Sequence, residues 1–542
     1  MEPLSPSAHQ DTFPRDSLPP REEWPELVFD LPELRYPPRL NCAVELLDTT
    51  IARFGDGPPA LRDDAGRVWS YGRLKERVDK IARVLAEDYG LVPGNRVLLH
   101  GPNSPWMAAC WLAVLKAGGV VVTTMALLRA KELHAVATKA RVGLALCDEH
   151  FTGELQRAGL PGLRIVAYGG ADCELNRRAA RGAAGFTAVD TAADDVALIA
   201  FTSGTSGQPK ATMHFHRDVL AIADTFSAHV LRPRPDDLFA GSPPLAFTFG
   251  LGGLLVFPLR AGASALLLPA ASPGELFGAV GRHGVTVLLT APTAYRTALR
   301  RIETYDLRSL RRCVSAGEAL PADTWHAFER ATGQRIIEGI GSTEMLHVFI
   351  SAADDDIRPG ATGRPVPGFR ARVVDEEGAP LPDGVPGRLA VQGPTGCRYL
   401  SDERQRAQVH NGWNITGDIY VRDADGYYRY QARADDMIVT AGYNVAAPEV
   451  EQAMIRHPAV LDCGVVGVPD PERGQVVKGF VVLAPGFDAG EELARDIKEF
   501  VKSEIAPYKY PRLVEFVAAL PFGDTGKLQR HVLRAALAAD RA

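Results

Sequence analysis

The 542-residue sequence has little that marks a partner of nucleic acids or a secreted, disulfide-bonded protein. Its 60 lysines and arginines form no basic block, and the formal net charge is -6, so we expect no nucleic-acid partner. Only seven cysteines are present, without the spacing of a metal site or a disulfide framework. We therefore expect reduced cysteines in a cytoplasmic protein.

Signals for membrane insertion or export are also absent. The stretch from Leu238 to Leu259 holds 22 residues without a charge, but three prolines and four glycines interrupt it. We interpret it as buried core and a site-forming loop rather than a membrane span. Residues 1–38 carry nine prolines and no apolar segment after a basic start, which indicates no signal peptide and predicts an extended arm over residues 1–40.

What remains is the composition of a globular enzyme, with 46% hydrophobic and 23% charged residues in a chain long enough for several structural units. Short apolar runs alternate with helical patterns such as those over 104–117 and 216–229. The apolar runs lie at 96–100, 119–123, 196–201, 263–268 and 285–289. This alternation predicts α/β layers with largely parallel sheets.

The pattern changes after residue 360, where turns rich in glycine and proline separate short strands and predict a β-barrel-like subdomain. Further along, the pattern predicts a helix after Pro448, strands over 460–468 and 478–483, and a helix that ends before Pro507. We therefore predict an α/β N-terminal domain over 41–434, with two α/β-layered subdomains and the β subdomain, and a small α+β domain over 435–542.

The segment with the most candidate binding groups follows the apolar run at 196–201 and reads Phe201-Thr-Ser-Gly-Thr-Ser-Gly-Gln-Pro-Lys210. Four hydroxyls, two glycines and a lysine suit a loop that wraps phosphate oxygens. The spacing of the glycines and Lys210 is not that of a Walker A loop. Because a Ser/Gly surface linker has the same composition, this loop alone indicates phosphate binding without establishing it.

Four later segments place charged side chains at turns. They read Glu338-Gly-Ile-Gly-Ser-Thr-Glu344, Trp413-Asn-Ile-Thr-Gly-Asp418, Ala432-Arg-Ala-Asp-Asp436 and Asp524-Thr-Gly-Lys527. Each alone is compatible with an ordinary polar turn. In this order after the loop at 202–210, they resemble the acyl-adenylate-forming superfamily of acyl- and aryl-CoA ligases, luciferases and adenylation domains, over essentially residues 45–535.

The resemblance implies an ATP site with Mg²⁺. Glu344, after the catalytic Thr343, would hold Mg²⁺ through hard carboxylate oxygens, and Asp418 with Arg433 would bind the ribose hydroxyls. The phosphate loop would consist of Thr202, Ser203, Gly204, Thr205, Ser206, Gly207 and Lys210. The nucleotide would also contact Gly317, Glu318, Gly339, Ile340, Gly341, Ser342 and Thr343.

Lys527 would be the catalytic lysine of the adenylation step, where it would offset the negative charge that builds at the α-phosphate. The lead-in Pro521-Phe-Gly departs from the usual Pro-Lys-Thr. Asp435 would be the hinge about which the mobile C-terminal domain turns. That rotation would replace Lys527 by a CoA-binding segment made of Ala441, Gly442 and Tyr443.

Two segments indicate which branch of the superfamily the chain resembles. Residues 339–347 resemble the benzoate-CoA ligase branch, and Thr212-Met-His-Phe-His-Arg-Asp218 resembles its members that activate 2-aminobenzoate. The phenylalanines suit a flat slot for one aromatic ring, although plain core packing explains them equally well. The acid would contact Phe247, Phe249, Gly250, Ala291, Tyr295, Ile340 and His347.

The resemblance therefore implies an acid–thiol ligase that uses ATP, Mg²⁺ and coenzyme A to activate a small aromatic acid, 2-aminobenzoate or benzoate. A stand-alone adenylation enzyme that loads a carrier protein stays open, as do the ortho substituent of the acid and a homodimer. A catalytically silent homologue is disfavoured, because Glu344, Asp418, Arg433 and Lys527 are all present.

Overall fold

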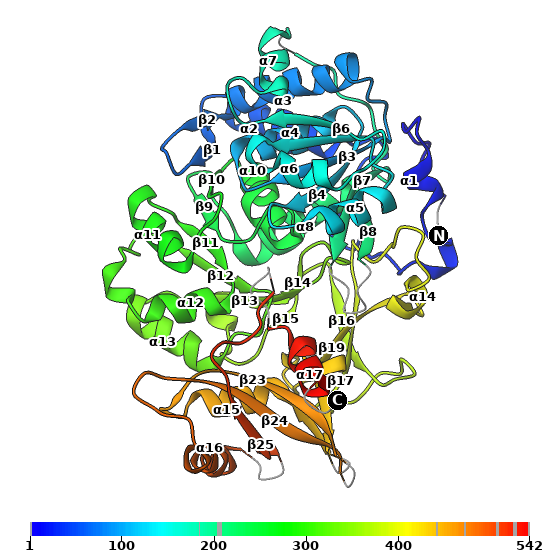
Figure 1. The fold of residues 1–542 in the computed structure, drawn as a ribbon. Helices are drawn as coiled ribbons and strands as arrows, with labels where there is room; N and C mark the ends of the chain where they lie inside the picture. Colours follow the sequence, from blue (N-terminus) through cyan, green and yellow to red (C-terminus); the bar gives the residue numbers. More distant parts are fainter. Residues whose placement is uncertain are drawn as a thin grey trace. The chain divides into compact units, whose positions relative to one another are not determined.

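A computed structural model describes residues 3–183, 185–202, 209–440, 443–470, 473–505, 509–523 and 528–539 (Figure 1). Contacts divide the chain into two compact units, the first made of residues 1–371 and 391–414 and the second of residues 372–390 and 415–542. No helix of the described residues is long and apolar enough to cross a membrane. All seven cysteines are buried and free, as predicted.

A six-stranded sheet of the first unit carries the loop at 202–210. The strand order is β6-β5-β3-β4-β7-β8, with every neighbouring pair parallel except the antiparallel pair β7 and β8. The strands are β3 (Arg96–Gly101), β4 (Val120–Met125), β5 (Leu144–Asp148), β6 (Arg164–Tyr168), β7 (Val196–Thr202) and β8 (Lys210–Phe215). Every residue of β3 is buried, which explains the apolar centre of the strand, Val97-Leu-Leu99.

Helices connect these strands as the alternating pattern predicts. Helix α4 lies within the predicted 104–117, and α8 continues through widened turns (η6, Ala223–Leu231) close to the predicted end at 229. The helices of this layer are α3 (Tyr71–Arg83), α4 (Pro105–Lys116), α5 (Ala130–Lys139), α6 (Thr152–Arg157), α7 (Glu174–Arg181) and α8 (His216–Ile222). Shorter helical segments are η3 (Val44–Asp48), α2 (Thr49–Phe54), η4 (Val84–Asp88) and η5 (Glu149–Phe151).

A nine-stranded sheet of the same unit has the order β15-β14-β13-β12-β11-β9-β10-β1-β2 and is parallel from β1 to β13. Its strands are β1 (Pro59–Asp63), β2 (Val68–Ser70), β9 (Leu238–Gly241), β10 (Ser264–Leu267), β11 (Val287–Thr290), β12 (Arg312–Ala316), β13 (Ile336–Gly341), β14 (Val348–Ser351) and β15 (Arg364–Pro365). Helices α11 (Pro273–His283), α12 (Pro292–Leu299) and α13 (Ala322–Thr332) pack together against it (Figure 1). Two short segments, η8 (Ile302–Thr304) and η9 (Asp354–Asp356), follow α12 and β14.

The uncharged stretch at 238–259 is a short strand, a turn and a helical run that begins only at Thr248, rather than one helix over its whole length. After β9 come α9 (Thr248–Leu251), η7 (Gly252–Val256) and α10 (Phe257–Ala261). Its residues from Gly250 to Leu259 are buried. The interpretation as buried core and loop is therefore confirmed.

The predicted arm lies on the first unit and contains only short helical turns, α1 (Phe13–Asp16), η1 (Arg21–Glu23) and η2 (Pro32–Leu34). Backbone hydrogen bonds fix it, from Glu26 to the Gly412 carbonyl at 2.8 Å and from Val28 to the Gly393 carbonyl at 2.9 Å. Trp24 is 4% exposed and packs against Phe215, with ring centroids 5.8 Å apart. The arm is thus part of the folded surface and not a free tail.

The turn-rich region forms a five-stranded sheet of order β16-β17-β19-β18, with β20 beside β19. Its elements are β16 (Arg370–Val374), β17 (Gly387–Gln392), α14 (Gln405–Gln408), β18 (Val409–His410), β19 (Trp413–Arg422) and β20 (Tyr428–Arg433). A last sheet has the order β22-β21-β24-β23, with β25 beside β24. Its strands are β21 (Met437–Thr440), β22 (Tyr443–Ala446), β23 (Val460–Asp470), β24 (Gly474–Leu483) and β25 (Leu513–Phe516).

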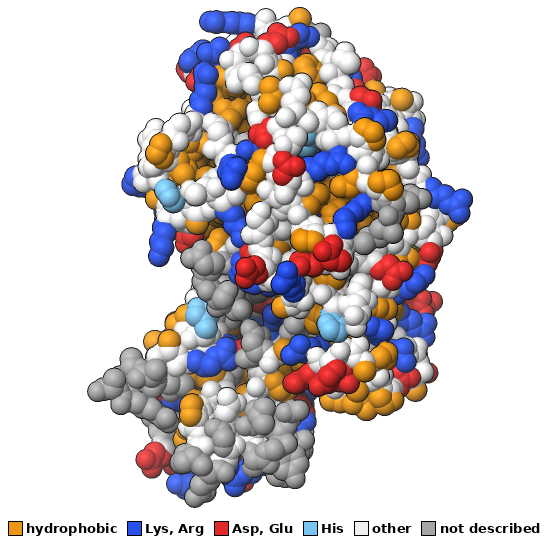
Figure 2. Space-filling view, turned by 90° about the vertical axis from the view of Figure 1, so that its right-hand side faces the viewer, with side chains coloured by type: hydrophobic (Ala, Val, Ile, Leu, Met, Phe, Trp, Pro, Cys, Tyr) orange, Lys and Arg blue, Asp and Glu red, His pale blue; other side chains and the backbone are white. Residues whose placement is uncertain are grey.

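Three helices, α15 (Ala447–Ile455), α16 (Glu491–Glu504) and α17 (Arg530–Ala539), accompany this last sheet after the short η10 (Ala434–Asp436). Ile497 and Val501 of α16 are fully buried against the sheet, which is the apolar face that the sequence predicts for this helix. The predicted fold class, α/β with a small α+β C-terminal part, is confirmed. On the face shown in Figure 2, acidic and basic side chains are interspersed.

Candidate active site

The phosphate-loop candidates begin and end on paired strands. Thr202 is the last residue of β7 and lies opposite Lys210, the first residue of β8, in antiparallel register. The segment between them therefore begins and ends at adjacent ends of two neighbouring strands. Ser203, Gly204, Thr205, Ser206 and Gly207 lie outside the described residues, so their contact with phosphate stays a prediction.

The turn that presents Glu344 follows β13 and is tightly packed. A side chain at Gly339 would meet Val348 at 2.7 Å, and one at Gly341 would meet the His347 carbonyl at 2.6 Å, so both positions require glycine. The Ser342 hydroxyl accepts a hydrogen bond from the Met345 amide at 3.2 Å. These contacts fix the backbone on both sides of Thr343 and Glu344.

Glu344 has a partner that sequence reasoning missed. The Tyr399 hydroxyl donates a hydrogen bond to Glu344 Oε1 at 2.6 Å, and Lys210 Nζ lies 5.2 Å from the centre of the Tyr399 ring. Burial and the Glu344 charge raise the pKa of Tyr399 far above its usual range, so the hydroxyl keeps its proton. Tyr399 thus contacts both Lys210 and Glu344. The sequence around Tyr399 indicates only a core residue.

The carboxylate of Glu344 fits the predicted Mg²⁺ ligand. Mg²⁺ in nucleotide sites takes one or two carboxylates and completes its shell with phosphate oxygens and water. The described residues contain no group of three Asp, Glu, His or Cys side chains that could hold a metal by themselves. Glu344 would therefore hold the ion only together with bound ATP, to which the ion would supply charge neutralisation.

The segment after β12 is tied to β13 through Glu338. Gly317 has a positive φ of 93°, and the chain then turns so that the Leu320 amide donates to Glu338 Oε1 at 3.0 Å. Gly317 and Glu318 are thereby held next to the strand that carries Gly339 and Ile340. This arrangement brings both predicted adenine segments to neighbouring strand ends.

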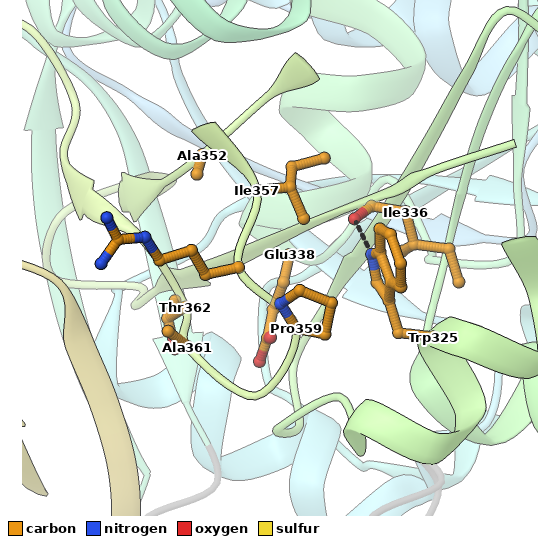
Figure 3. A pocket seen from close by; sticks show the side chains of 9 residues that line it. Trp325, Ile336, Glu338, Ala352, Ile357, Pro359, Ala361 and Thr362 are labelled. Carbon is orange, nitrogen blue, oxygen red and sulfur yellow. Dashed lines mark hydrogen bonds between the residues drawn. The ribbon is translucent and has the colours of Figure 1, made fainter. Parts of the chain in front are cut away.

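Glu338 also lines a small pocket (Figure 3). The other lining residues are Trp325, Ile336, Ala352, Ile357, Arg358, Pro359, Ala361 and Thr362, and the Trp325 indole donates to the Ile336 carbonyl at 2.8 Å. Burial raises the pKa of Glu338 to about 7, although the Leu320 amide acts in the opposite direction. This carboxyl group is therefore half-protonated near neutral pH.

His347 lies in a cluster of aromatic rings. Its ring centroid is 4.6 Å from that of Phe257, 5.3 Å from that of Phe226 and 5.7 Å from that of Phe249. Burial lowers the pKa of His347 to about 3, so the ring is neutral. The ring is only 2% exposed and packs as part of the core, so its contact with the acid stays a prediction.

The other predicted acid contacts occupy different environments. Phe247 precedes α9 and is half-buried, whereas Gly250 packs so closely that a side chain there would meet the Pro244 carbonyl at 2.1 Å. Ala291 directly precedes α12 and is half-buried. Tyr295 is fully buried, and its hydroxyl donates to the Val314 carbonyl at 3.0 Å, which is a core position; its contact with the acid stays a prediction.

In the second unit, Asp418 of β19 and Arg433 of β20 are opposite each other in the antiparallel pair. Arg433 Nη1 lies 3.3 Å from Asp418 Oδ1, and Asp418 is only 15% exposed. The two residues that the resemblance assigns to the ribose are therefore adjacent. A carboxylate held in this way is oriented to accept hydrogen bonds from a diol.

The remaining predictions fall largely outside the described residues. Lys527, Ala441 and Gly442 are not described, and of Asp435 and Tyr443 only the backbone is described, in η10 and β22. Beside Asp435, the Asp436 carboxylate accepts from Arg534 at 3.0 Å and lies 3.5 Å from Arg530, which also binds Glu451. These ion pairs anchor α17 within the second unit.

Comparison with known proteins adds independent findings. Residues 47–399 match the family described as AMP-binding enzyme, and residues 449–527 match its C-terminal domain. The benzoate–CoA ligase of Thauera aromatica is 36% identical over 516 residues, which cover 93% of this chain and 98% of that protein. A solved anthranilate CoA ligase in complex with anthranoyl-AMP is 34% identical with a TM-score of 0.89, over 94% of this chain and all of the other. A benzoate CoA ligase structure from Burkholderia xenovorans LB400 is 33% identical with a TM-score of 0.84, over 91% of this chain and all of the other.

Proposed function

The chain belongs to the AMP-binding enzyme family and is an acid–thiol ligase, and we propose that the acid it activates is 2-aminobenzoate or, as the next candidate, benzoate. Its partners in the reaction would be ATP and free coenzyme A. The full-length similarity to ligases named for benzoate and anthranilate supports this proposal.

The reaction would proceed in two steps. First, a carboxylate oxygen of the acid would attack the α-phosphorus of ATP, the bond to the β-phosphate would break, and pyrophosphate would leave. The thiol of coenzyme A then loses its proton and attacks the carbonyl carbon, and AMP departs with the oxygen that joined it to the acid. Two steps are needed because a free carboxylate is a poor electrophile, whereas the mixed anhydride carries a good leaving group.

Each predicted residue would contribute a distinct interaction. Thr202 and Lys210 would hold the phosphates at the two ends of the loop, and Glu344 would bind Mg²⁺ with Tyr399 orienting its carboxylate. Asp418 would accept the ribose hydroxyls. Lys527 would neutralise charge at the α-phosphate during the first step, and a hinge at Asp435 would exchange it for the segment 441–443 in the second.

The observation that supports an aromatic acid as the substrate is the cluster of aromatic rings around His347. Three phenylalanine rings lie within 5.7 Å of it, centroid to centroid. A flat aromatic acid offers rings to stack and an ortho amino group or carboxylate to hydrogen-bond. A fatty acid has the same carboxylate but no ring to stack on the phenylalanines, which favours an aryl acid.

A direct assay with a panel of acids tests this proposal. Purified protein would receive MgATP, coenzyme A and, in turn, 2-aminobenzoate, benzoate, salicylate, 4-hydroxybenzoate or a medium-chain fatty acid, with thioester and pyrophosphate both measured. We expect thioester from 2-aminobenzoate and benzoate, with kcat/KM at least about 100-fold above that of the fatty acid. Pyrophosphate without thioester would indicate a carrier protein as acceptor, and turnover of the fatty acid alone would contradict the aryl assignment.

A further inference from the structure

A chain of fully buried polar side chains runs through the first unit toward the turn at Thr343. Its members are His214 at the end of β8, Asp218 in the first turn of α8, and Arg398 in the segment that pairs with β8; all three side chains are 0% exposed. Buried ionisable groups are costly unless they are paired, so such a cluster requires a structural reason.

Asp218 and Arg398 form the charged end of this chain. Arg398 donates to Asp218 Oδ2, which also accepts the Phe215 amide at 3.0 Å. Burial alone would raise the pKa of Asp218, but the Arg398 guanidinium beside it holds that pKa below its usual range. The carboxylate is therefore charged and fixed between the end of β8 and the start of α8.

His214 connects this pair to the turn that presents Glu344. Its Nε2 lies 2.8 Å from the carbonyl oxygen of Thr343, whereas its Nδ1, 3.7 Å from Asp218 Oδ2, makes only a van der Waals contact with that carboxylate. Because a carbonyl oxygen only accepts, Nε2 must carry the hydrogen. The imidazole thus holds the backbone of Thr343, the residue directly before Glu344.

The N-terminal arm contacts Arg398, at the other end of this group of side chains. The Arg398 guanidinium lies 4.1 Å from the Phe215 ring centroid and 5.5 Å from that of Trp24, so it stacks between β8 and the arm. Trp24 is held in turn by its indole, which donates to the Pro19 carbonyl at 2.8 Å. Backbone hydrogen bonds of Glu26 and Val28 hold the adjoining part of the arm.

We propose that His214 is a positioning residue that sets the Thr343 carbonyl and thereby the Glu344 carboxylate for MgATP, and that Asp218, Arg398 and Trp24 hold His214 in place. The inference rests on the proposed function of Glu344 as the Mg²⁺ ligand. It gives the arm a role in nucleotide binding, and it explains why a histidine, rather than an apolar residue, lies in this part of the core.

The test compares two substitutions at His214. His214→Gln keeps an N–H donor at the place of Nε2, whereas His214→Leu removes it at similar volume. Calorimetry would measure the binding of MgATP, and of ATP in excess EDTA, to the full chain. We expect His214→Leu to weaken MgATP about tenfold or more and metal-free ATP less than about threefold, while His214→Gln stays within about threefold of wild type for both.

A neighbouring histidine provides the matched control. His216 is equally buried, but its Nδ1 accepts a hydrogen bond from the Cys42 amide at 3.2 Å. We expect His216→Gln to leave the ratio of MgATP to metal-free ATP affinity unchanged. Should His214→Leu fail to fold, Trp24→Leu is the second test, with the same selective loss expected at about threefold.

Three results would overturn the proposal: unchanged MgATP affinity in His214→Leu, equal loss for ATP with and without Mg²⁺, or loss in His214→Gln as large as in His214→Leu. If Trp24→Leu is the variant that folds, unchanged MgATP affinity would overturn it. Because binding is measured without any acid, the outcome is separate from the substrate assignment. Failure of the acid panel with normal MgATP binding would contradict the proposed function and leave this inference standing.

Discussion

The Tyr399 hydroxyl and the Glu344 carboxylate are joined by a hydrogen bond of 2.6 Å, although the two residues are 55 positions apart. Tyr399 reaches Glu344 because its segment pairs with β8, through hydrogen bonds from the Met213 amide to the Arg398 carbonyl and from the Leu400 amide to the Ala211 carbonyl, both 2.8 Å. The strand that follows the predicted phosphate loop therefore also positions the carboxylate that is proposed to bind Mg²⁺.

Tyr399→Phe removes only this hydroxyl and tests its contribution. A hydrogen bond to a charged group is worth about 1.5 kcal/mol or more, so we expect kcat/KM for MgATP in pyrophosphate exchange to fall roughly tenfold. Thioester formation from supplied aryl-AMP needs no Mg²⁺ and should change less than about twofold. Equal losses in both half-reactions would contradict this role.

Tyr168→Phe is the control for loss of a buried hydroxyl. Tyr168 is fully buried, and its hydroxyl lies 3.3 Å from the His100 carbonyl. It belongs to β6, at the opposite edge of the six-stranded sheet from β8. We expect its removal to affect stability and to leave kcat/KM for MgATP within about twofold.

Gly252→Ala tests the ring cluster around His347. An added Cβ would lie 2.4 Å from His347 Cδ2, a distance that forces the imidazole to move. We expect KM for the aryl acid to rise about tenfold or more and KM for ATP to change little, as measured by initial rates with each substrate varied. In contrast, Gly274→Ala adds a Cβ at an ordinary 3.5 Å from the Tyr305 hydroxyl and should leave both KM values unchanged.

Most elements could be predicted from the sequence because each depends on local pattern. The apolar run at 96–100 became β3 over Arg96–Gly101, and the apolar face around Ile497 became α16. The stretch at 238–259 is interrupted at Pro243 and Pro244, between β9 and the helical run that begins at Thr248. Such features depend on the spacing of apolar residues and on the backbone conformations that proline and glycine allow, both of which can be seen within a few residues.

The contacts of the site could not be predicted in the same way. The Tyr399–Glu344 and His214–Thr343 hydrogen bonds join residues 55 and 129 positions apart, and no local pattern encodes that pairing. A tyrosine or histidine in an apolar run is typical of ordinary core. Only the three-dimensional pairing of the segment at 398–400 with β8 shows which of them reach the site.

Asp418→Asn tests the ribose assignment. The carboxylate becomes a neutral amide of the same shape, so the charge-assisted hydrogen bonds to a diol are lost and KM for ATP should rise about 10- to 100-fold. The control is Asp383→Asn, which removes a similar but exposed pair with Arg422 on the same strand, β19. A comparable rise in KM in both variants would refute the assignment.

Glu338 predicts a specific pH dependence of stability. Burial raises its pKa in the folded chain to about 7, from an ordinary value of 4.5. The folded state therefore holds the proton more tightly, and this contribution is full below about pH 4.5 and is lost as the pH rises through 7.

Glu338→Gln keeps an acceptor for the Leu320 amide and cannot ionise, so its stability advantage over wild type should grow from pH 5 to pH 8. The gain at pH 8 should be of the order of 1 to 3 kcal/mol, measured by urea unfolding at several pH values. Parallel pH profiles for the two proteins would show that Glu338 ionises normally.

The central claim, that this chain joins an aryl acid to coenzyme A through an aryl adenylate, is tested most directly with 2-aminobenzoate and benzoate labelled by ¹⁸O in both carboxylate oxygens. With MgATP and coenzyme A, we predict the CoA thioester of one or both acids, pyrophosphate, and AMP that carries one ¹⁸O atom, read by mass spectrometry. Unlabelled AMP, formation of ADP and phosphate, or absence of thioester from both acids would contradict it.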